Sequence, residues 1–108
     1  MSGKKSRTKG HDFERKFAEY LRIYGYDALT SRSESRNLDN LGVDLVDNTK
    51  FYFQLKAVEK LSPGYHEILK NMPTEKVPVV VHKRNNKGTI IAMKLEDFAN
   101  MLLYKEDV

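Results

Sequence analysis

The chain has 108 residues, of which 40% are hydrophobic and 31% are charged, and this is the composition of one small globular domain rather than of a disordered segment. Its apolar runs are only a few residues long, which excludes a membrane-spanning helix, and no apolar stretch follows the basic N-terminus, so a secretory signal is not expected. Cysteine is absent, which excludes disulfides, thiol catalysis and cysteine-bound zinc and leads us to expect a cytoplasmic protein.

The net charge of +4 arises within the first ten residues. Lys4, Lys5, Arg7 and Lys9 lie there without an acid, whereas the remainder of the chain holds equal numbers of basic and acidic side chains. We therefore predict a flexible basic arm over residues 1–10 and a single domain over residues 11–108. Such an arm suits contact with a phosphate backbone, although it is equally typical of a solubilising tail.

Apolar side chains recur at helical spacing at Phe13, Phe17, Tyr20, Leu21 and Tyr24. A helix is therefore expected from about Phe13, with Asp12 as its N-cap and Gly25 as its stop. Further along the chain we predict a short strand or connector over 27–30, a polar loop over 31–40, strands over 42–46 and 51–57, a short helix over 63–72, strands over 76–81 and 89–93, and a helix over 95–103. This order predicts a small α/β or α+β fold with helices packed on a sheet, and we expect the α/β class.

The segment from Phe51 to Ala57 places two polar side chains on one face of a strand that is otherwise apolar. Because side chains alternate between faces, Gln54 and Lys56 point away from the face of Phe53. Asp44 is likewise a lone charge inside the apolar run Gly42–Val46. Burying such groups costs free energy unless they have polar partners, so their presence indicates a function. Alternatively, Gln54 and Lys56 are the solvated face of an edge strand, and Asp44 is a turn former.

The link between the two segments decides whether these side chains meet. A hairpin with a three-residue loop, Asn48-Thr49-Lys50, pairs Asp47 with Phe51 and places Asp44 opposite Gln54, whereas a four-residue loop sends Asp44 to the other face. We predict the three-residue loop, with Asp47 as the residue that caps the turn. Carboxylate and amide oxygens are ligands for Mg²⁺, and an ammonium group stabilises the charge on a reacting phosphate. Together they point to phosphodiester hydrolysis.

The pattern of a helix with Glu14, then Gly42-Val43-Asp44-Leu45, then Gln54-Leu55-Lys56 resembles the PD-(D/E)xK nuclease superfamily, and within it the small phage and archaeal Holliday junction resolvases. The similarity covers about residues 10–100. It implies a restriction-endonuclease-like mixed β-sheet flanked by helices, with catalytic residues at Glu14, Asp44, Gln54 and Lys56. Gln54 departs from the glutamate that is commoner at this position, so weaker metal binding is expected.

The resemblance also implies a ligand set and a substrate. Asp44, Gln54 and the Leu55 carbonyl would hold Mg²⁺, with Mn²⁺ as a substitute, while Glu14 would orient water or serve a second metal. Glu14 could instead be an acid that favours the helix dipole. Contacts to the DNA backbone are expected from the arm and the polar loop, at Lys4, Lys5, Arg7, Lys9, Arg32, Ser33, Ser35 and Arg36.

The expected function is that of a Mg²⁺-dependent, structure-selective endonuclease acting on branched DNA in recombination or repair, encoded by a phage or mobile element. Because a four-way junction has two strands related by two-fold symmetry, a homodimer is expected. Two alternatives remain open: a non-catalytic DNA-binding protein on the same fold, and a restriction- or repair-type endonuclease that cuts linear duplex. The three histidines lack metal-ligand spacing and are expected at the surface or the edge of the core.

Overall fold

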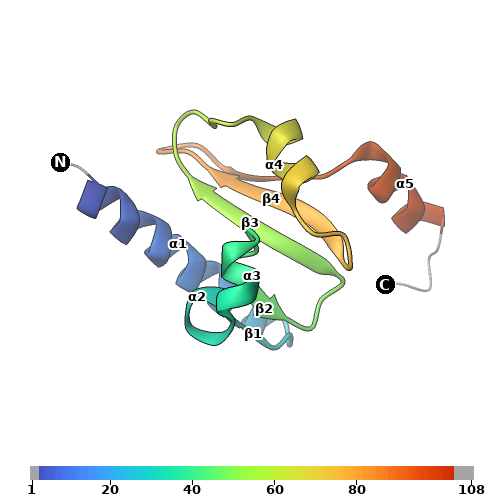
Figure 1. Cartoon of the computed structure of the whole chain (residues 1–108), viewed down its shortest axis with the longest axis horizontal. Helices are drawn as coiled ribbons and strands as arrows, with labels where there is room; N and C mark the ends of the chain where they lie inside the picture. Colours follow the sequence, from blue (N-terminus) through green and yellow to red (C-terminus); the bar gives the residue numbers. More distant parts are fainter. Residues whose placement is uncertain (1–2, 104–108) are drawn as a thin grey trace.

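A three-stranded mixed sheet lies at the centre of the computed structural model, which describes the backbone of residues 3–103 and the side chains of residues 7–103 (Figure 1). Strand β3 (Phe51–Ala57) runs parallel to β4 (Val77–Lys83), and β5 (Thr89–Ala92) runs antiparallel to β4. Helices pack against this sheet, so the fold is a mixed α/β fold, as the order of elements predicted.

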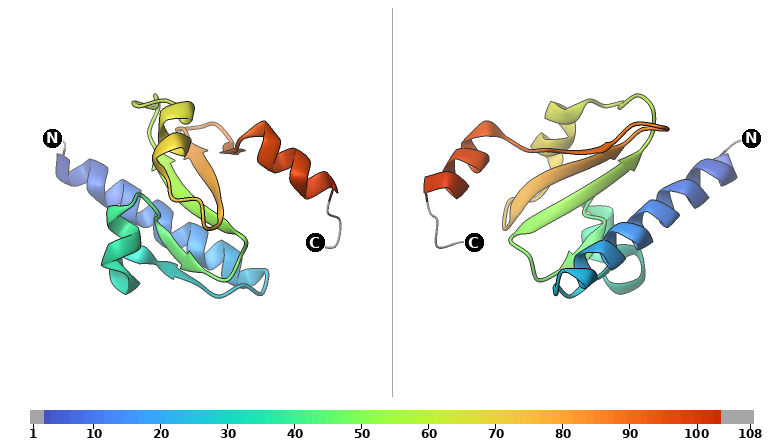
Figure 2. Two further views of the ribbon diagram at one scale, coloured as in Figure 1. Left: turned by 45° about the vertical axis from the view of Figure 1, so that its right-hand side comes forward. Right: turned by 180° about the vertical axis from the view of Figure 1, so that it is seen from behind.

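Helices cover both faces of the sheet (Figures 1 and 2). Helix α1 (Gly3–Ile23) packs on the face that carries Phe53 and Leu55, whereas α4 (Tyr65–Asn71) packs on the opposite face. The central strand β4 is therefore enclosed from both sides, and its run Val79–Val81 is at most 1% exposed. A continuous valine run of this kind is typical of a strand buried on both faces.

The remaining elements surround this core. Strands β1 (Ala28–Thr30) and β2 (Leu45–Asp47) form a separate antiparallel pair, and the short helices α2 (Ser31–Glu34) and α3 (Arg36–Asn40) lie between them in the chain. Helix α5 (Leu95–Leu103) follows β5 and projects from one end of the molecule (Figure 1). Within residues 3–103, no helix combines the length and the apolar character needed to cross a bilayer.

Helix α1 begins at Gly3, well before the start that the sequence predicts at Phe13. Residues 3–10, which were expected in a flexible arm, form its first turns, and residues 1 and 2 lie outside the described part of the chain. Lysine and arginine have good helix propensity, so a helix nucleated by the downstream apolar stripe can extend through a basic segment. Asp12 is not its N-cap but pairs with Arg15 one turn later. The predicted stop is confirmed, because Gly25 adopts φ +96° directly after the last turn.

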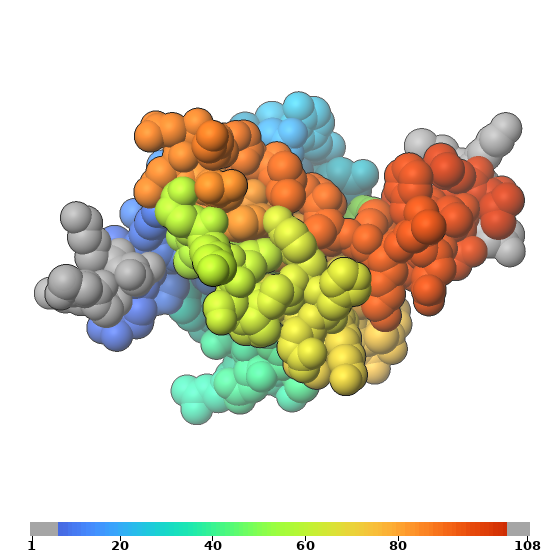
Figure 3. All heavy atoms as spheres, turned by 90° about the horizontal axis from the view of Figure 1, so that it is seen from above, coloured from blue at the N-terminus to red at the C-terminus, as the bar shows by residue number. Residues whose placement is uncertain are grey.

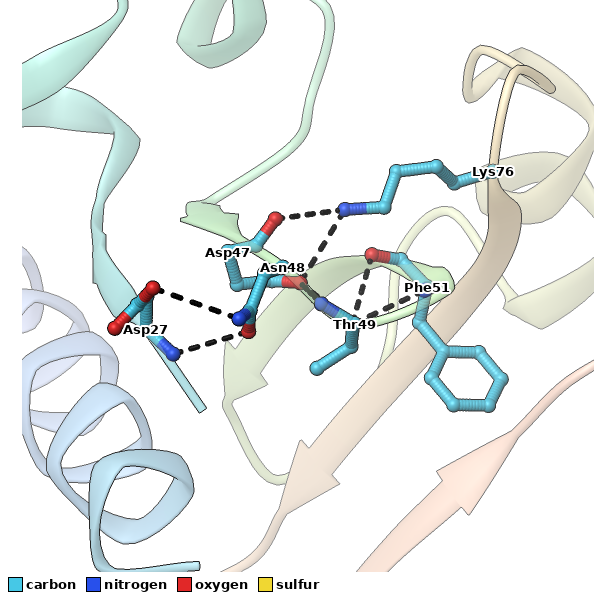
Figure 4. Close-up of polar contacts among 6 residues, drawn as sticks. All are labelled: Asp27, Asp47, Asn48, Thr49, Phe51 and Lys76. Atoms are coloured by element: carbon cyan, nitrogen blue, oxygen red, sulfur yellow. Dashed lines mark hydrogen bonds and ion pairs between the residues drawn. The ribbon is translucent and has the colours of Figure 1, made fainter. Parts of the chain in front are cut away.

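The predicted hairpin between β2 and β3 is wrong, because Asp47 pairs with Ala28 and Phe51 pairs with Val77. The predicted three-residue turn is nevertheless present between the two strands (Figure 4). Asp47 caps it as expected: its Oδ1 accepts from the Thr49 backbone N–H at 2.9 Å and from the Thr49 hydroxyl at 2.5 Å. Across the turn, the Lys76 ammonium donates to the Asp47 carbonyl at 2.9 Å. These bonds fix where β3 begins relative to β2.

Other predicted elements differ in detail. The segment 31–40 is not a loop but contains α2 and α3, and Ser35 caps α3 by accepting from the Leu38 N–H at 3.2 Å. Helix α4 begins at Tyr65 after Gly64 rather than after a Ser62 cap. The strands predicted over 76–81 and 89–93 are confirmed as β4 and β5, which pair with each other, and the C-terminal helix over 95–103 is confirmed.

Candidate functional site

Asp44 directly precedes β2 and is held by three hydrogen bonds, two of them to β3. Its backbone N–H donates to the Phe53 carbonyl at 2.8 Å, and its carbonyl accepts from the Ser31 N–H at 2.9 Å. Its carboxylate accepts the Leu55 N–H at 2.7 Å. Asp44 thus bonds to both chain neighbours of Gln54 and lies across from that residue, as predicted. The Leu55 N–H, however, donates to the Asp44 carboxylate and not to a backbone carbonyl, as it would in a regular pair of strands.

The carboxyl group of Asp44 lies among other charged groups in a largely dry environment. Burial raises the pKa of Asp44 to about 7, against the hydrogen bond from the Leu55 amide, which lowers it. Repulsion from Glu14 and Asp39 raises this pKa further, whereas the attraction of Lys56 lowers it. The charges of Glu14 and Lys56 therefore both act on the Asp44 carboxyl group. A buried carboxyl with a strongly perturbed pKa beside charged partners is typical of functional sites.

Gln54 lies against the backbone that leads to Asp44. A Cβ atom added to Gly42 would stand 3.0 Å from the Gln54 Oε1 atom, so the amide occupies the space that a side chain at position 42 would need. Gly42 also has φ +82°, a conformation that residues with a Cβ rarely adopt. The glycine two residues before Asp44 thus makes room for Gln54.

Lys56 lies beside a buried histidine that the sequence did not indicate. The parallel register pairs Lys56 with His82, which is 6% exposed. The Nε2 atom of His82 lies 2.7 Å from the Val58 carbonyl, and Nδ1 lies 2.8 Å from the Tyr65 hydroxyl. Because a carbonyl only accepts, Nε2 carries the proton and Nδ1 accepts from Tyr65. This bonded pair forms a fixed neighbour of Lys56, and only the strand register reveals it.

Glu14 is on the side of α1 that faces the site, one turn before Ala18, which is 1% exposed. Its carboxylate lies 3.3 Å from the Nε atom of Arg32 at the start of α2. The side chain of Glu14 is only 15% exposed, so the pair is partly shielded from solvent. The sequence predicted that Arg32 contacts DNA and did not anticipate this ion pair, because nothing in the local pattern links α1 to α2.

The geometry partly fits a hard divalent cation. Because the N–H and C=O of one strand residue point to the same edge, the Leu55 carbonyl lies on the edge where the Asp44 carboxylate binds the Leu55 N–H. In the part of the chain that the structure describes, histidine, aspartate and glutamate form no group of three arranged to hold a metal. A cation bound at Asp44 would be held by the carboxylate together with amide or carbonyl oxygens and water, which are ligands that Mg²⁺ accepts.

The predicted DNA contacts fall into two places. Arg32, Ser33, Ser35 and Arg36 lie on or between α2 and α3, and Arg32 contacts Glu14. The two serines also have local roles, since Ser35 caps α3 and the Ser33 hydroxyl donates to the Thr30 carbonyl at 3.0 Å. Arg7 and Lys9 are exposed on α1, where the Lys9 ammonium donates to the Asn85 side chain at 2.9 Å. The side chains of Lys4 and Lys5 lie outside the described residues.

Alanine at position 42 is expected to destabilise the fold by about 1–2 kcal/mol, because a Cβ is strained at this positive φ. The new Cβ should also displace Gln54, and if the Gln54 amide is a Mg²⁺ ligand, Mg²⁺ binding should weaken. Urea unfolding measures the first effect, and calorimetric titration with Mg²⁺ measures the second.

Gly25→Ala is the matched control. Gly25 has φ +96°, but a Cβ there meets nothing within 4 Å. It should therefore lose similar stability and keep its Mg²⁺ affinity. Equal affinity in both variants would exclude Gln54 as a ligand.

The comparisons with known proteins identify no family for this chain. No protein-family model matches it, and neither the curated proteins nor the solved structures gave a significant match.

Proposed function

We propose that the protein is a Mg²⁺-dependent endonuclease that hydrolyses phosphodiester bonds in branched DNA, with four-way junctions as its preferred substrate. The observation that carries this proposal is the Asp44 carboxylate, which is largely buried, accepts a hydrogen bond from the Leu55 amide, and lies close enough to Glu14 and Lys56 for their charges to shift its pKa. An acid, a second acid and an ammonium group in one place provide both a cation ligand and a positive charge for a phosphate.

The order of the elements supports the proposal. Glu14 is on the first helix, Asp44 directly precedes the second strand, and Gln54 and Lys56 are on the third. This is the placement that the resemblance to the PD-(D/E)xK nucleases implies. Helix α4 then leads to β4, which lies parallel to β3. On this basis we propose a restriction-endonuclease-like fold.

Each residue has a role in the proposed reaction. Asp44, Gln54 and the Leu55 carbonyl would hold Mg²⁺, which polarises the phosphoryl group when it is bound. Lys56 would stabilise the negative charge that develops on the scissile phosphate. Glu14 would orient the attacking water, and this requires that Arg32 exchange its contact with Glu14 for one with DNA.

The basic side chains of α1 and α2–α3 would contact the DNA backbone, which predicts binding that weakens steeply with salt. A four-way junction has two equivalent strands to cut, so we propose that two copies of the chain act together.

The test is cleavage of a labelled four-way junction and of a linear duplex with the same arms, each with Mg²⁺ and with EDTA. We expect Mg²⁺-dependent nicking of the junction and little cutting of the duplex. Equal cutting of both substrates would instead assign a general duplex nuclease. Absence of cutting with either Mg²⁺ or Mn²⁺ would overturn the proposed activity.

Gln54 favours one second candidate, a DNA-binding protein that does not cleave. An amide is a weaker ligand than a carboxylate, and Arg32 already neutralises Glu14 in the free protein. Gln54→Glu separates the two functions. If the wild-type chain binds the junction without cutting and this variant cuts it, the second candidate is correct.

A further inference from the structure

Helix α5 has no buried residue although its sequence is amphipathic. Leu95, Phe98, Leu102 and Leu103 are between 46% and 80% exposed. A nine-residue helix is marginal in water unless its apolar face packs against something. Figure 3 shows its spheres gathered at one end of the molecule. The helix therefore presents an apolar face that the rest of the described chain leaves open.

A groove with matching properties lies between α1 and the edge of the sheet. It encloses about 1270 Å³, and its floor is formed by apolar side chains that include Phe13, Phe17, Val81 and Ile91. Helix α1 covers the β3 side of this sheet face, whereas Ile91 on β5 remains 55% exposed. An open groove with an apolar floor is the kind of surface into which an amphipathic helix can lay its apolar face.

The charges of the groove and the helix are complementary. Lys9, Lys16 and Lys83 line the groove, and its acid, Asp12, is paired with Arg15. In contrast, the described part of α5 carries the acids Glu96 and Asp97 and no basic residue. An apolar helix with two acids in its first turn thus matches an apolar floor with a basic rim.

We propose that α5 of one protomer docks in the groove of a second copy of the chain, and that the second copy returns the contact. This exchange closes under two-fold symmetry, so each dimer contains two identical helix-in-groove contacts. This proposal rests on the proposed function and identifies the surface through which the nuclease would dimerise. Dimer formation is measured without DNA or metal, so failure of this proposal is distinguishable from failure of the proposed activity.

Sedimentation equilibrium of the full chain tests the exchange with one variant on each side. Leu102→Glu alters the helix and Ile91→Glu alters the groove, whereas Ile23→Glu changes an apolar side chain that is 74% exposed at the end of α1, outside the groove. We expect a dimer for the wild-type chain and for Ile23→Glu. For the other two variants we expect the dissociation constant of the dimer to be at least 100-fold higher. A mixture of these two variants should recover a heterodimer, because one of its two contacts is intact.

Three results would overturn the proposal: a wild-type chain that stays monomeric, a dimer that resists Ile91→Glu, and a mixture that recovers no heterodimer. The second would indicate that α5 pairs with α5. Because Glu at position 91 could impair folding, cross-linking provides a second readout in this cysteine-free chain. Leu102→Cys combined with Thr89→Cys should give a covalent dimer on oxidation, whereas Leu102→Cys combined with Glu34→Cys should not.

Discussion

Replacement of Asp44 by asparagine is expected to raise the free energy of unfolding at pH 8 by up to about 4 kcal/mol and to abolish Mg²⁺ binding. The pKa of Asp44 is raised to about 7, mainly by burial, so at pH 8 the folded protein holds a buried negative charge that lowers its stability. Asparagine is neutral and has the same shape, and its Oδ1 can still accept the Leu55 N–H. Function at this position would thus be maintained at the expense of stability.

The gain depends on pH in a defined direction. In the unfolded chain Asp44 loses its proton near pH 4, whereas the folded protein keeps it until about pH 7. Between these values the folded state binds more protons, so the wild-type protein loses stability as the pH rises from 4 to 7 and loses no more above this range. The difference between Asp44→Asn and the wild type should therefore be near zero at pH 4 and largest above pH 7. Urea unfolding across this range measures it.

Mg²⁺ should narrow the difference in stability between Asp44→Asn and the wild type. The cation competes with the proton for Asp44, so it should stabilise the wild-type chain at pH 8, by about 2.7 kcal/mol at 100 times its dissociation constant, and less at pH 6. Asp44→Asn should not respond. Glu19→Gln, at an exposed position on α1, removes the same charge and is the control that should behave as wild type. If Asp44→Asn changes stability equally at pH 5 and pH 8, the carboxyl does not titrate as described.

The parts of the fold that follow from local periodicity could be predicted. The stripe from Phe13 to Tyr24 identifies α1, and the pattern over 95–103 identifies α5. The start of α1 could not be predicted, because residues 4–9 are polar and carry no stripe, although lysine and arginine permit a helix.

The strand partners depend on contacts distant in sequence, so they were harder to predict. A short turn between two apolar runs favours a hairpin, yet β3 pairs with β4 across α4 instead. The signal that favours this pairing is the run Val79–Val81, since a strand without alternation is buried on both faces and belongs in the middle of a sheet. The wrong hairpin still placed Asp44 across from Gln54, because the turn length was correct.

The candidate site divides in the same way. Gln54, Lys56 and Asp44 were identified because each is a polar residue inside an apolar run. The pairs Arg32–Glu14 and Tyr65–His82 were missed, because each joins two elements whose relative position only the tertiary structure gives. Sequence periodicity thus identified candidate residues within single strands, whereas the contacts between elements were found only in the structure.

Lys56→Met should reduce the rate of junction cleavage by about 10²–10³-fold, which is the effect of removing one group that stabilises charge in a transition state. The methionine keeps most of the side-chain volume on β3 and removes the ammonium group that attracts Asp44. Junction affinity should change little, because a single phosphate contact contributes only a small part of the binding. Single-turnover cleavage at saturating protein measures the rate without interference from binding.

Lys60→Met is the matched control, since it removes the same charge at an exposed position four residues later and should cut at the wild-type rate. Lys56→Met should also raise the pKa of Asp44 further, because the attraction of the ammonium group is lost. Its Mg²⁺ affinity should then fall more steeply below pH 7 than that of the wild type. A variant that loses cleavage and shows this shift would place Lys56 beside both the metal and the phosphate. A variant that loses junction affinity but cuts bound DNA at the normal rate would assign Lys56 to DNA binding alone.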